Sequence, residues 1–447
     1  MKNKQNRTEN NPVENQPVIP TQIRRSERIK KPVDKYGQWR AHCALVNEIE
    51  GEIMDDQMAI AYKASFEMEN NIVPNSFKQA MKLPDKSKWK TAIFEELDSL
   101  ENNKVFEVIK NIDLKDKTLV GNRWVLTKKF DKNGNLKRYK ARCVAQGFKQ
   151  KEGIDYQETF SPTGRLTTLR YLFALAAHLN EEVRQADFVT AYLNAKLEED
   201  EIVYMSIPEG FKEWLIETKP ETLRKKHIND FLKGSSKNDY ILKLNKSLYG
   251  LKQSARSWYN TISHWLEKKG FQTSDADPCL FISSSAMLFV WVDDIIILGP
   301  KRNELIKEIQ KDFKIKDLGK AQHVLGMKIS YGKNGSIRMD QEHYIKALIQ
   351  KYKMDDAKIS TTPLKSTIKL VEATEQEVLE FKKTGLDYRA AIGCLNYLSQ
   401  CTRPDITYTV GVLSQFLENP GIEHWKAFKK CLRYLVNTKD IGLNYST

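Results

Sequence analysis

The feature that most constrains this chain is a pair of aspartates between two apolar segments. Met287–Val292 and Ile295–Leu298 are rich in valine, isoleucine and aromatic residues, and Asp293 and Asp294 lie between them. Enrichment of this kind predicts a strand on each side of the break and a hairpin at the break itself. Aspartates are ordinary in tight turns because they hydrogen-bond their own backbone, and for the pair taken alone this interpretation stays open.

A functional interpretation follows from the cost of placing two like charges beside buried strands. Adjacent carboxylates repel each other and resist desolvation unless a cation offsets them. An all-carboxylate site with open positions suits Mg²⁺ rather than Zn²⁺. A third carboxylate would complete a site for two ions about 3.5–4 Å apart. Asp187, inside the strand-like segment Val183–Leu193, is the candidate.

A strongly basic block covers residues 122–152, with ten Lys or Arg against two acidic residues. Trp124–Phe130 and Leu136–Gly147 flank an Asn133-Gly134 pair, which predicts a β-hairpin. The basic residues of this ribbon that could bind triphosphate oxygens are Lys128, Lys129, Arg138 and Arg142. The whole chain has a formal net charge of +14, which favours a polyanionic partner. Together the two features indicate phosphoryl transfer on a polyanion.

Composition divides the rest of the chain. The N-terminal stretch is basic, rich in asparagine and poor in apolar residues, so we expect a disordered linker over residues 1–75. Apolar spacing predicts helices over Lys86–Asn102 and after Ser161-Pro162. Residues 213–239 are polar and Lys-rich, which indicates a surface insertion, and residues 351–447 end in a helical segment.

Other residues with suggestive chemistry are interpreted as structural. Cysteine and histidine at helix-face spacing do not match zinc-site spacing: they are Cys394, Cys401, His424 and Cys431. Four apolar residues at helical intervals predict a core face, with a base-stacking platform as the less favoured alternative: Trp258, Ile262, Trp265 and Leu266.

Cysteine usage and hydropathy bear on the compartment. Six cysteines in 447 residues form no disulfide framework, which indicates a reducing intracellular environment, either nuclear or in cytoplasmic particles. The longest apolar run, Ala286–Val292, is far short of the roughly 20 residues that cross a bilayer. We therefore expect no membrane partner.

Nine stretches in order along the chain carry a resemblance to a known family: they are Trp89–Glu96, Arg138–Phe148, Glu158–Pro162, Gln185–Asn194, Leu248–Ser254, Val292–Asp294, Tyr388–Gly393, Thr402–Ile406 and His424–Trp425. In these stretches the chain, from about Trp89 to its end, resembles the reverse transcriptase region of Ty1/copia-type retrotransposon Pol polyproteins. So many matches in series make the resemblance specific.

The resemblance implies an α+β right-hand polymerase, with fingers and palm over residues 76–350 and a helical thumb-like or connection-like part over 351–447. It implies a DNA polymerase that copies RNA or DNA from a primer, using dNTPs and two Mg²⁺ ions, with Mn²⁺ as an alternative. Asp187, Asp293 and Asp294 would be the catalytic carboxylates and metal ligands. The region before residue 76 is similar to the junction that follows the integrase, so other parts of a Pol polyprotein are expected partners.

The resemblance also implies substrate contacts. The residues implied at the dNTP are Lys128 or Lys129, Arg142, Tyr192 and Tyr249, with the Tyr192 ring under the sugar, where it would exclude a 2′-hydroxyl. The residues implied at the template–primer are Lys252, Gln253, Ser254 and Trp291.

Two positions depart from the family pattern, and two other functions stay open. Trp291 stands where Tyr is usual, and Ala255 stands where Pro is usual. The chain stops at Thr447, about where the family begins a ribonuclease H domain, so we expect that domain to be absent. One alternative is a decayed element that only binds nucleic acid. The other is a different phosphotransferase on a palm-like fold, such as a cyclase.

Overall fold

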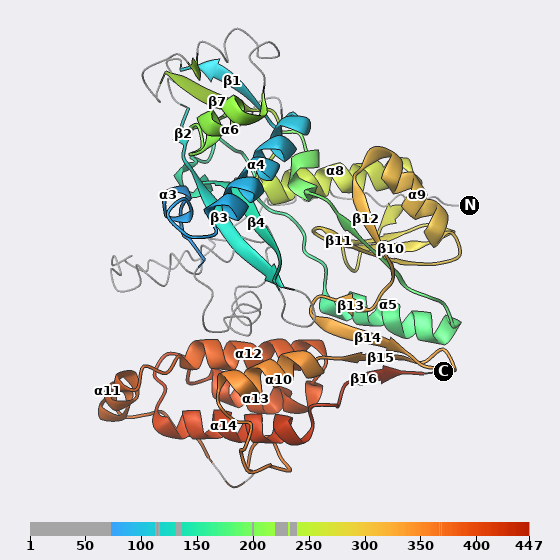
Figure 1. Ribbon diagram of the computed structural model, residues 1–447. Helices are drawn as coiled ribbons and strands as arrows, with labels where there is room; N and C mark the ends of the chain where they lie inside the picture. Colours follow the sequence, from blue (N-terminus) through green and yellow to red (C-terminus); the bar gives the residue numbers. More distant parts are fainter. Residues whose placement is uncertain are drawn as a thin grey trace, which may run out of the picture. The chain divides into compact units, whose positions relative to one another are not determined.

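Helices and sheets alternate along the described chain (Figure 1). The computed structural model describes residues 73–446 except 112–113, 115–116, 131–135, 199–200, 220–230, 233–238, 366 and 368. The predicted linker over residues 1–75 lies almost entirely outside these residues. The mixture of helix and sheet confirms the predicted α+β class in its coarse form.

The largest sheet carries the three aspartates. Its strands, in spatial order, are β12 (Ile315–Lys320), β5 (Arg184–Phe188), β11 (Asp294–Leu298), β10 (Met287–Trp291), β9 (Leu280–Ile282) and β8 (Gln272–Thr273). The predicted hairpin is confirmed, because β10 pairs antiparallel with β11 and Trp291 lies opposite Asp294. Only Val292 and Asp293 remain in the turn.

Both faces of this sheet are buried. One face packs on α5 (Leu166–Leu179) in a cluster that includes Phe289 and Ile296, which we call the α5 core. The other packs on α8 (Ser254–Lys268) in a cluster that includes Val290 and Ile295, which we call the α8 core. Helix α9 (Arg302–Asp312) adds Leu305, Ile306 and Ile309 to the α8 core. Because successive strand residues point to opposite faces, burial on both sides explains the continuous apolar runs around the aspartates.

The basic block forms a separate two-stranded ribbon, as predicted. Strand β3 (Asn122–Phe130) pairs antiparallel with β4 (Leu136–Ala145), and the predicted Asn133-Gly134 turn lies outside the described residues. The predicted helix is confirmed as α4 (Lys86–Asn102), which buries its apolar face against the ribbon and is preceded by α3 (Phe77–Ala80).

A small mixed sheet packs into the same cluster as the ribbon. Its strands, in spatial order, are β1 (Phe106–Lys110), β7 (Tyr240–Leu244), β6 (Val203–Met205) and β2 (Leu119–Val120). Helix α6 (Phe211–Thr218) buries Trp214 and Leu215 there, and Phe231 is also buried in this cluster. The predicted surface insertion over 213–239 is therefore wrong for these residues, because their apolar side chains belong to the core.

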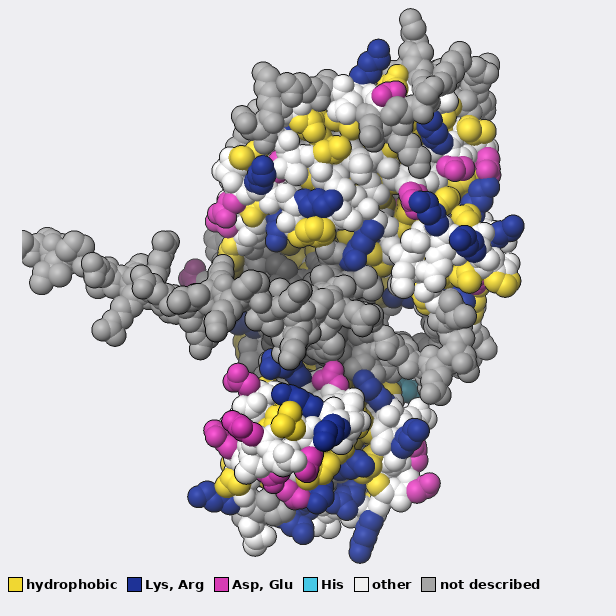
Figure 2. All heavy atoms as spheres, turned by 90° about the vertical axis from the view of Figure 1, so that its left-hand side faces the viewer, with side chains coloured by type: hydrophobic (Ala, Val, Ile, Leu, Met, Phe, Trp, Pro, Cys, Tyr) yellow, Lys and Arg dark blue, Asp and Glu magenta, His cyan; other side chains and the backbone are white. Residues whose placement is uncertain are grey.

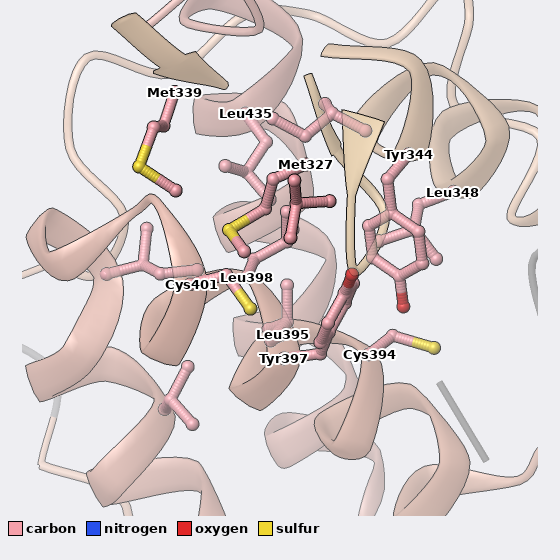
Figure 3. Packing of buried hydrophobic residues seen from close by; sticks show 14 of the residues in the cluster. Met327, Met339, Tyr344, Leu348, Cys394, Leu395, Tyr397, Leu398, Cys401 and Leu435 are labelled. Atoms are coloured by element: carbon pink, nitrogen blue, oxygen red, sulfur yellow. The ribbon is translucent and has the colours of Figure 1, made fainter. Parts of the chain in front are cut away.

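The C-terminal part combines a third sheet with helices. The sheet order is β13 (His323–Val324), β14 (Met327–Tyr331), β15 (Ile337–Asp340) and β16 (Leu443–Tyr445). The helices are α10 (Glu342–Lys351), α11 (Glu375–Lys383), α12 (Tyr388–Cys401), α13 (Thr407–Ser414) and α14 (Ile422–Asn437). Residues on both sides of the predicted division at 350/351 share this sheet and the α5 core, as the packing of Met327, Tyr344 and Leu398 shows (Figure 3).

Short 3₁₀ turns complete the fold: η1 (Gly147–Lys149), η2 (Ala191–Asn194) and η4 (Pro404–Ile406). The last of these follows Arg403, whose side chain is fully buried and bonded to Asp405 and to Thr438. A buried guanidinium needs such partners, and this network joins the start of α13 to the end of α14.

Sulfur and histidine in the C-terminal part have structural surroundings, as the sequence indicated. Five cysteines lie in the described part of the chain, and all are buried and free: Cys143, Cys279, Cys394, Cys401 and Cys431. His424 stacks on Phe416 with ring centroids 4.0 Å apart and accepts a hydrogen bond from the Gly421 amide. None of the described helices is long and apolar enough to cross a bilayer.

Candidate active site

Strand pairing brings the three aspartates to one place. Asp187, near the end of β5, lies directly opposite Asp294, the first residue of β11. Directly opposite residues in an antiparallel pair have Cα atoms about 4.5–5.5 Å apart. Asp293 occupies the adjoining turn, and its carbonyl accepts a 2.7 Å hydrogen bond from the Phe188 amide. Residues more than 100 positions apart in sequence thus converge on one edge of the sheet.

The three carboxyls are partly buried and disfavour one another's ionisation. Burial, together with the charges of Asp187 and Asp294, raises the pKa of Asp293 to about 7. Arg142 and Lys140 of the ribbon act in the opposite direction on the same pKa. The ribbon is therefore close enough to this turn to influence its charge.

The two aspartates on the strands have similar surroundings. Burial raises the pKa of Asp294 to about 6, and a 3.2 Å hydrogen bond from Gln185 to its Oδ1 opposes that rise. Burial also raises the pKa of Asp187, while Lys140 and Lys316 lower it. Lys316 lies directly opposite Asp187 on β12. The cluster thus combines mutually repelling acids with nearby cations.

These residues have the donor chemistry of a hard-cation site. The Asp293 Oδ1 atom is buried and has no hydrogen-bond partner among the described residues. An orphaned carboxylate oxygen beside two other carboxyls is an arrangement that Mg²⁺ would satisfy. Within the described part of the chain, however, no three Asp, Glu, His or Cys side chains are already placed as a metal-binding group. Strand pairing places the three aspartates together, but their side chains do not form a ready-made cage among the described residues.

Strand alternation sorts the basic residues of the ribbon by face. Lys129 lies opposite Arg138, and Arg142 lies opposite Val125, which packs in the α8 core. Lys140 lies two residues from Arg142 on β4 and so has its side chain on the same face of the ribbon. The sequence did not single out Lys140 as a possible phosphate contact, although this alternation includes it. Burial lowers the pKa of Lys140 to about 8, and the neighbouring cations Arg142, Lys129 and Arg138 contribute to this lowering. Several positive charges therefore lie close together on this face.

Lys128 faces the opposite side of the ribbon. Its Nζ atom lies 3.3 Å from an Asp85 carboxylate oxygen, and its side chain is only 12% exposed. The same ammonium lies over the rings of Trp89 and Tyr139. Lys128 is thus engaged with α4 and its flank, whereas Lys129 lies on the other face of the ribbon, opposite Arg138.

Two tyrosines connect the ribbon to the aspartates. The rings of Tyr192 and Tyr249 meet edge to face with centroids 5.2 Å apart. The Arg142 guanidinium lies over the Tyr249 ring at 5.1 Å. Both tyrosines are almost fully buried, so they present packing surface rather than open hydroxyls.

The segment predicted to contact the template–primer is mostly internal. Only the Lys252 side chain is exposed, whereas Gln253 and Ser254 are 1% and 2% exposed. Gln253 donates to the Asp155 carbonyl, and the Ser254 hydroxyl donates to the Leu248 carbonyl. The expectation that Gln253 and Ser254 contact the template–primer through their side chains is corrected, because these side chains are buried and hydrogen-bonded in the interior.

Trp291 also differs from the expectation. It is 6% exposed and packs beside Phe289 in the α5 core. A side chain in that position packs from the hairpin into the α5 core and has little exposed surface that nucleic acid could contact. Of the four residues predicted at the template–primer, only Lys252 has an accessible side chain.

The ribbon is joined to the turn before α8 by a close approach of two glycines. A Cβ on Gly147 would lie 2.1 Å from the Gly250 carbonyl oxygen, and one on Gly250 would lie 2.2 Å from the Ala145 carbonyl oxygen. Main-chain bonds run from the Ala145 amide to Tyr249 and from the Gly147 amide to Gly250. Glycine is required at both positions because the two backbones touch.

Glu96 is a further residue that sequence analysis left without a role. It is buried on α4, and its Oε1 accepts a hydrogen bond from the Cys143 amide on β4. Burial raises the pKa of Glu96 to about 7. Burial therefore favours the protonated form of this carboxyl, although the hydrogen bond from the Cys143 amide favours the ionised form.

We expect Glu96→Gln to stabilise the protein at pH 8 by about 3 kcal/mol and to leave its stability nearly unchanged at pH 4. The folded pKa lies above the ordinary value of 4.5, so stability from this group is full below pH 4.5 and is lost as the pH rises towards 7. The amide keeps the acceptor for Cys143 without the charge. Urea unfolding at both pH values checks this, with exposed Glu95→Gln as the control; equal shifts for both variants would contradict it.

Charge on the visible surface does not by itself locate a binding site. On the face in Figure 2, Lys and Arg side chains are scattered among acidic and hydrophobic ones. The positive charges that act on the aspartates belong to Arg142 and Lys140 of the ribbon, which lower the pKa of Asp293.

Comparison with known proteins agrees with the geometry. A reverse transcriptase (RNA-dependent DNA polymerase) family model matches residues 103–366. The Retrovirus-related Pol polyprotein from transposon TNT 1-94 of Nicotiana tabacum is 38% identical over 82% of this chain and 26% of its own length. The corresponding polyprotein from transposon RE1 of Arabidopsis thaliana is 34% identical over 83% of this chain and 24% of its own length.

A shorter relative gives a similar result. The putative transposon Ty5-1 protein of Saccharomyces cerevisiae is 29% identical over 58% of this chain and 78% of its own length. The chain spans about a quarter of the length of the plant polyproteins. It belongs to the reverse transcriptase (RNA-dependent DNA polymerase) family, in the form found in copia-type Pol polyproteins.

Proposed function

We propose that the chain is an RNA-directed DNA polymerase that also accepts DNA templates and adds dNTPs to a primer 3′-hydroxyl. The observation that carries the proposal is the convergence of Asp187, Asp293 and Asp294 beside the basic face of the ribbon. Acidic and basic groups in that arrangement suit a metal-assisted phosphoryl transfer on a polyanionic substrate.

Each part of the fold has a proposed role in that reaction. The ribbon with α4 acts as fingers, the six-stranded sheet as palm, and the C-terminal helices as a thumb-like part. RNA or DNA with an annealed primer is the proposed template, and other segments of a Pol polyprotein are proposed partners.

The aspartates are proposed to hold two Mg²⁺ ions. When bound, such ions lower the pKa of an attacking hydroxyl and offset the charge of the leaving pyrophosphate. Asp187 and Asp293 are the main proposed ligands, and Asp293 must lose its proton before it can bind a cation. Asp294 adds charge to the site, and its Oδ1 is fixed by the hydrogen bond from Gln185.

Substrate contacts are proposed for the ribbon and the tyrosines. Lys129 and Arg142 would bind triphosphate oxygens from one face of the ribbon. Tyr192 would pack under the sugar, where its ring would exclude a 2′-hydroxyl; because the ring is 2% exposed in this structure, that contact requires the neighbouring side chains to move aside. Tyr249 would support that ring and orient Arg142, with which it is in contact.

Primer extension on poly(rA)/oligo(dT) with Mg²⁺ tests the proposal, together with filter binding of the same duplex. We expect both extension and binding. If about six phosphates are contacted, log K should fall with log salt with a slope of about −5. Binding without extension would favour the decayed-element alternative, and neither activity would favour a different phosphotransferase.

Adjacent lysines give a sharper test of the ribbon. Lys129→Ala should raise the KM for dNTP about tenfold, since a hydrogen bond from a charged group is worth about 1.5–3 kcal/mol. Lys128→Ala should leave that KM within about twofold, because Lys128 is paired with Asp85. Steady-state extension with varied dNTP measures both values. The opposite ranking of the two variants would refute the assignment of faces.

A further inference from the structure

The turn that holds Asp293 is strained. Val292 has φ +49°, in the left-handed region that β-branched residues rarely adopt. Two-residue hairpin turns favour glycine or asparagine where φ is positive. Holding valine there is unfavourable, so the surrounding structure must supply interactions that keep it in place.

An indole from α8 supplies one of those interactions. The Trp258 Nε1–H donates a 2.8 Å hydrogen bond to the Val292 carbonyl, which lies in the turn outside the β10–β11 ladder. Trp258 is 2% exposed, and its ring meets Phe188 and Phe313 edge to face, with centroids 4.7 and 5.8 Å apart. A donor so enclosed cannot move to follow a relaxed turn.

The same indole touches both β5, which carries Asp187, and the turn that carries Asp293. It contacts Phe188, the neighbour of Asp187 on β5, and it bonds the residue before Asp293. An apolar side chain could fill this core position, but it would leave the Val292 carbonyl without this donor. The hydrogen bond therefore fixes the position of the turn relative to β5.

We propose that Trp258 is a positioning residue that fixes the Asp293 carboxylate by holding the strained Val292 carbonyl. This inference rests on the proposed polymerase function of the same site. It assigns a role to a residue that sequence analysis interpreted as core packing with a base-stacking alternative. Its effect passes through Val292.

Trp258→Phe tests this, with Trp265→Phe as the matched control. Trp265 lies two turns along the same helix, and its Nε1 donates at 2.8 Å to exposed Asp312. We expect W258F to lower kcat about tenfold, with the KM for dNTP and primer within twofold, and to raise the Mg²⁺ concentration for half-maximal rate. W265F should leave all three unchanged. Equal behaviour of the two variants would overturn the proposal.

A second variant asks whether the effect passes through the strained turn. Glycine adopts a positive φ without strain, so in a Val292→Gly background we expect W258F to cost less than threefold in kcat. A full tenfold loss in that background would show that the indole acts elsewhere. If W258F does not fold, benzothienylalanine at position 258 replaces only the N–H by sulfur and should give the same tenfold loss.

Mn²⁺ binding measured by electron paramagnetic resonance separates this inference from the proposed function. We expect W258F to weaken Mn²⁺ binding about fivefold and W265F to leave it unchanged, whether or not the wild type extends primers. Absence of extension by the wild type would refute the polymerase function alone. Unchanged Mn²⁺ affinity in W258F would refute the role of the indole.

Discussion

Replacing Asp293 by Asn should reduce primer extension by at least about 10³-fold, which corresponds to about 4 kcal/mol of lost transition-state stabilisation. Asn removes the charge that would hold a cation and keeps the size of the side chain. Duplex binding should stay within about twofold, because the proposed phosphate contacts lie on the ribbon. Folding stability at pH 8 should not fall, since the variant removes a carboxyl whose pKa is raised to about 7 by burial and by its acidic neighbours.

The matched control for this variant is Asp317→Asn. Asp317 lies on β12 of the same sheet and is paired with Arg184 at 2.7 Å, away from the turn. Extension by D317N should stay within about threefold of the parent. Comparable extension rates for D293N and the parent protein would refute the two-metal proposal. A loss of duplex binding in D293N would indicate that the nucleic acid contacts the turn directly.

The second large effect is expected at the junction of ribbon and palm. Gly250→Ala should destabilise the protein by more than about 3 kcal/mol or prevent it from folding, because the new Cβ would lie 2.2 Å from the Ala145 carbonyl oxygen. Gly270 has nearly the same φ, +83° against +88°, but nothing lies within 4 Å of its Cβ position. Gly270→Ala should therefore cost only about 1 kcal/mol of backbone strain.

Urea unfolding and soluble yield of the two variants measure this difference. Since φ is matched, the excess cost of G250A reports the close approach of the two backbones. Similar stability of G250A and G270A would mean that the ribbon can shift away from the turn, and the junction would then be a hinge and not a fixed joint.

Periodicity and local composition were enough to predict the elements around the site. The helix Lys86–Asn102 followed from the spacing of its buried residues, and it forms with those bounds. The two strands around Asp293 followed from β-branched and aromatic enrichment. These features depend on short-range patterns, which a single sequence carries in full.

Side-chain partners could not be predicted in the same way. Gln253 looks like any polar loop residue in sequence, yet it is buried because Gln150 and Asp155 satisfy its amide. Those partners are about 100 positions away, and no local pattern encodes them. The difference between Lys128 and Lys129 arises likewise from Asp85, which reaches the ribbon only after α4 packs on it.

The Trp258 hydrogen bond shows the same limit. Helical spacing predicted that this ring is buried, and burial is confirmed. The spacing says nothing about where the indole N–H points, because that depends on the turn between β10 and β11, more than 30 residues later. The sequence predicted that Asp187, Asp293 and Asp294 would come together, and strand pairing brings them together, whereas the hydrogen bond from Trp258 to their turn could not be predicted.

The buried sulfurs described above have a practical consequence. Burial raises the pKa of Cys279, Cys401 and Cys431 to about 12 each, so their thiolates are scarce even in alkaline buffer. An alkylating reagent can reach them only while the packing around them is open. The rate of labelling at each cysteine, measured by mass spectrometry, would therefore report how often the packing around that cysteine opens.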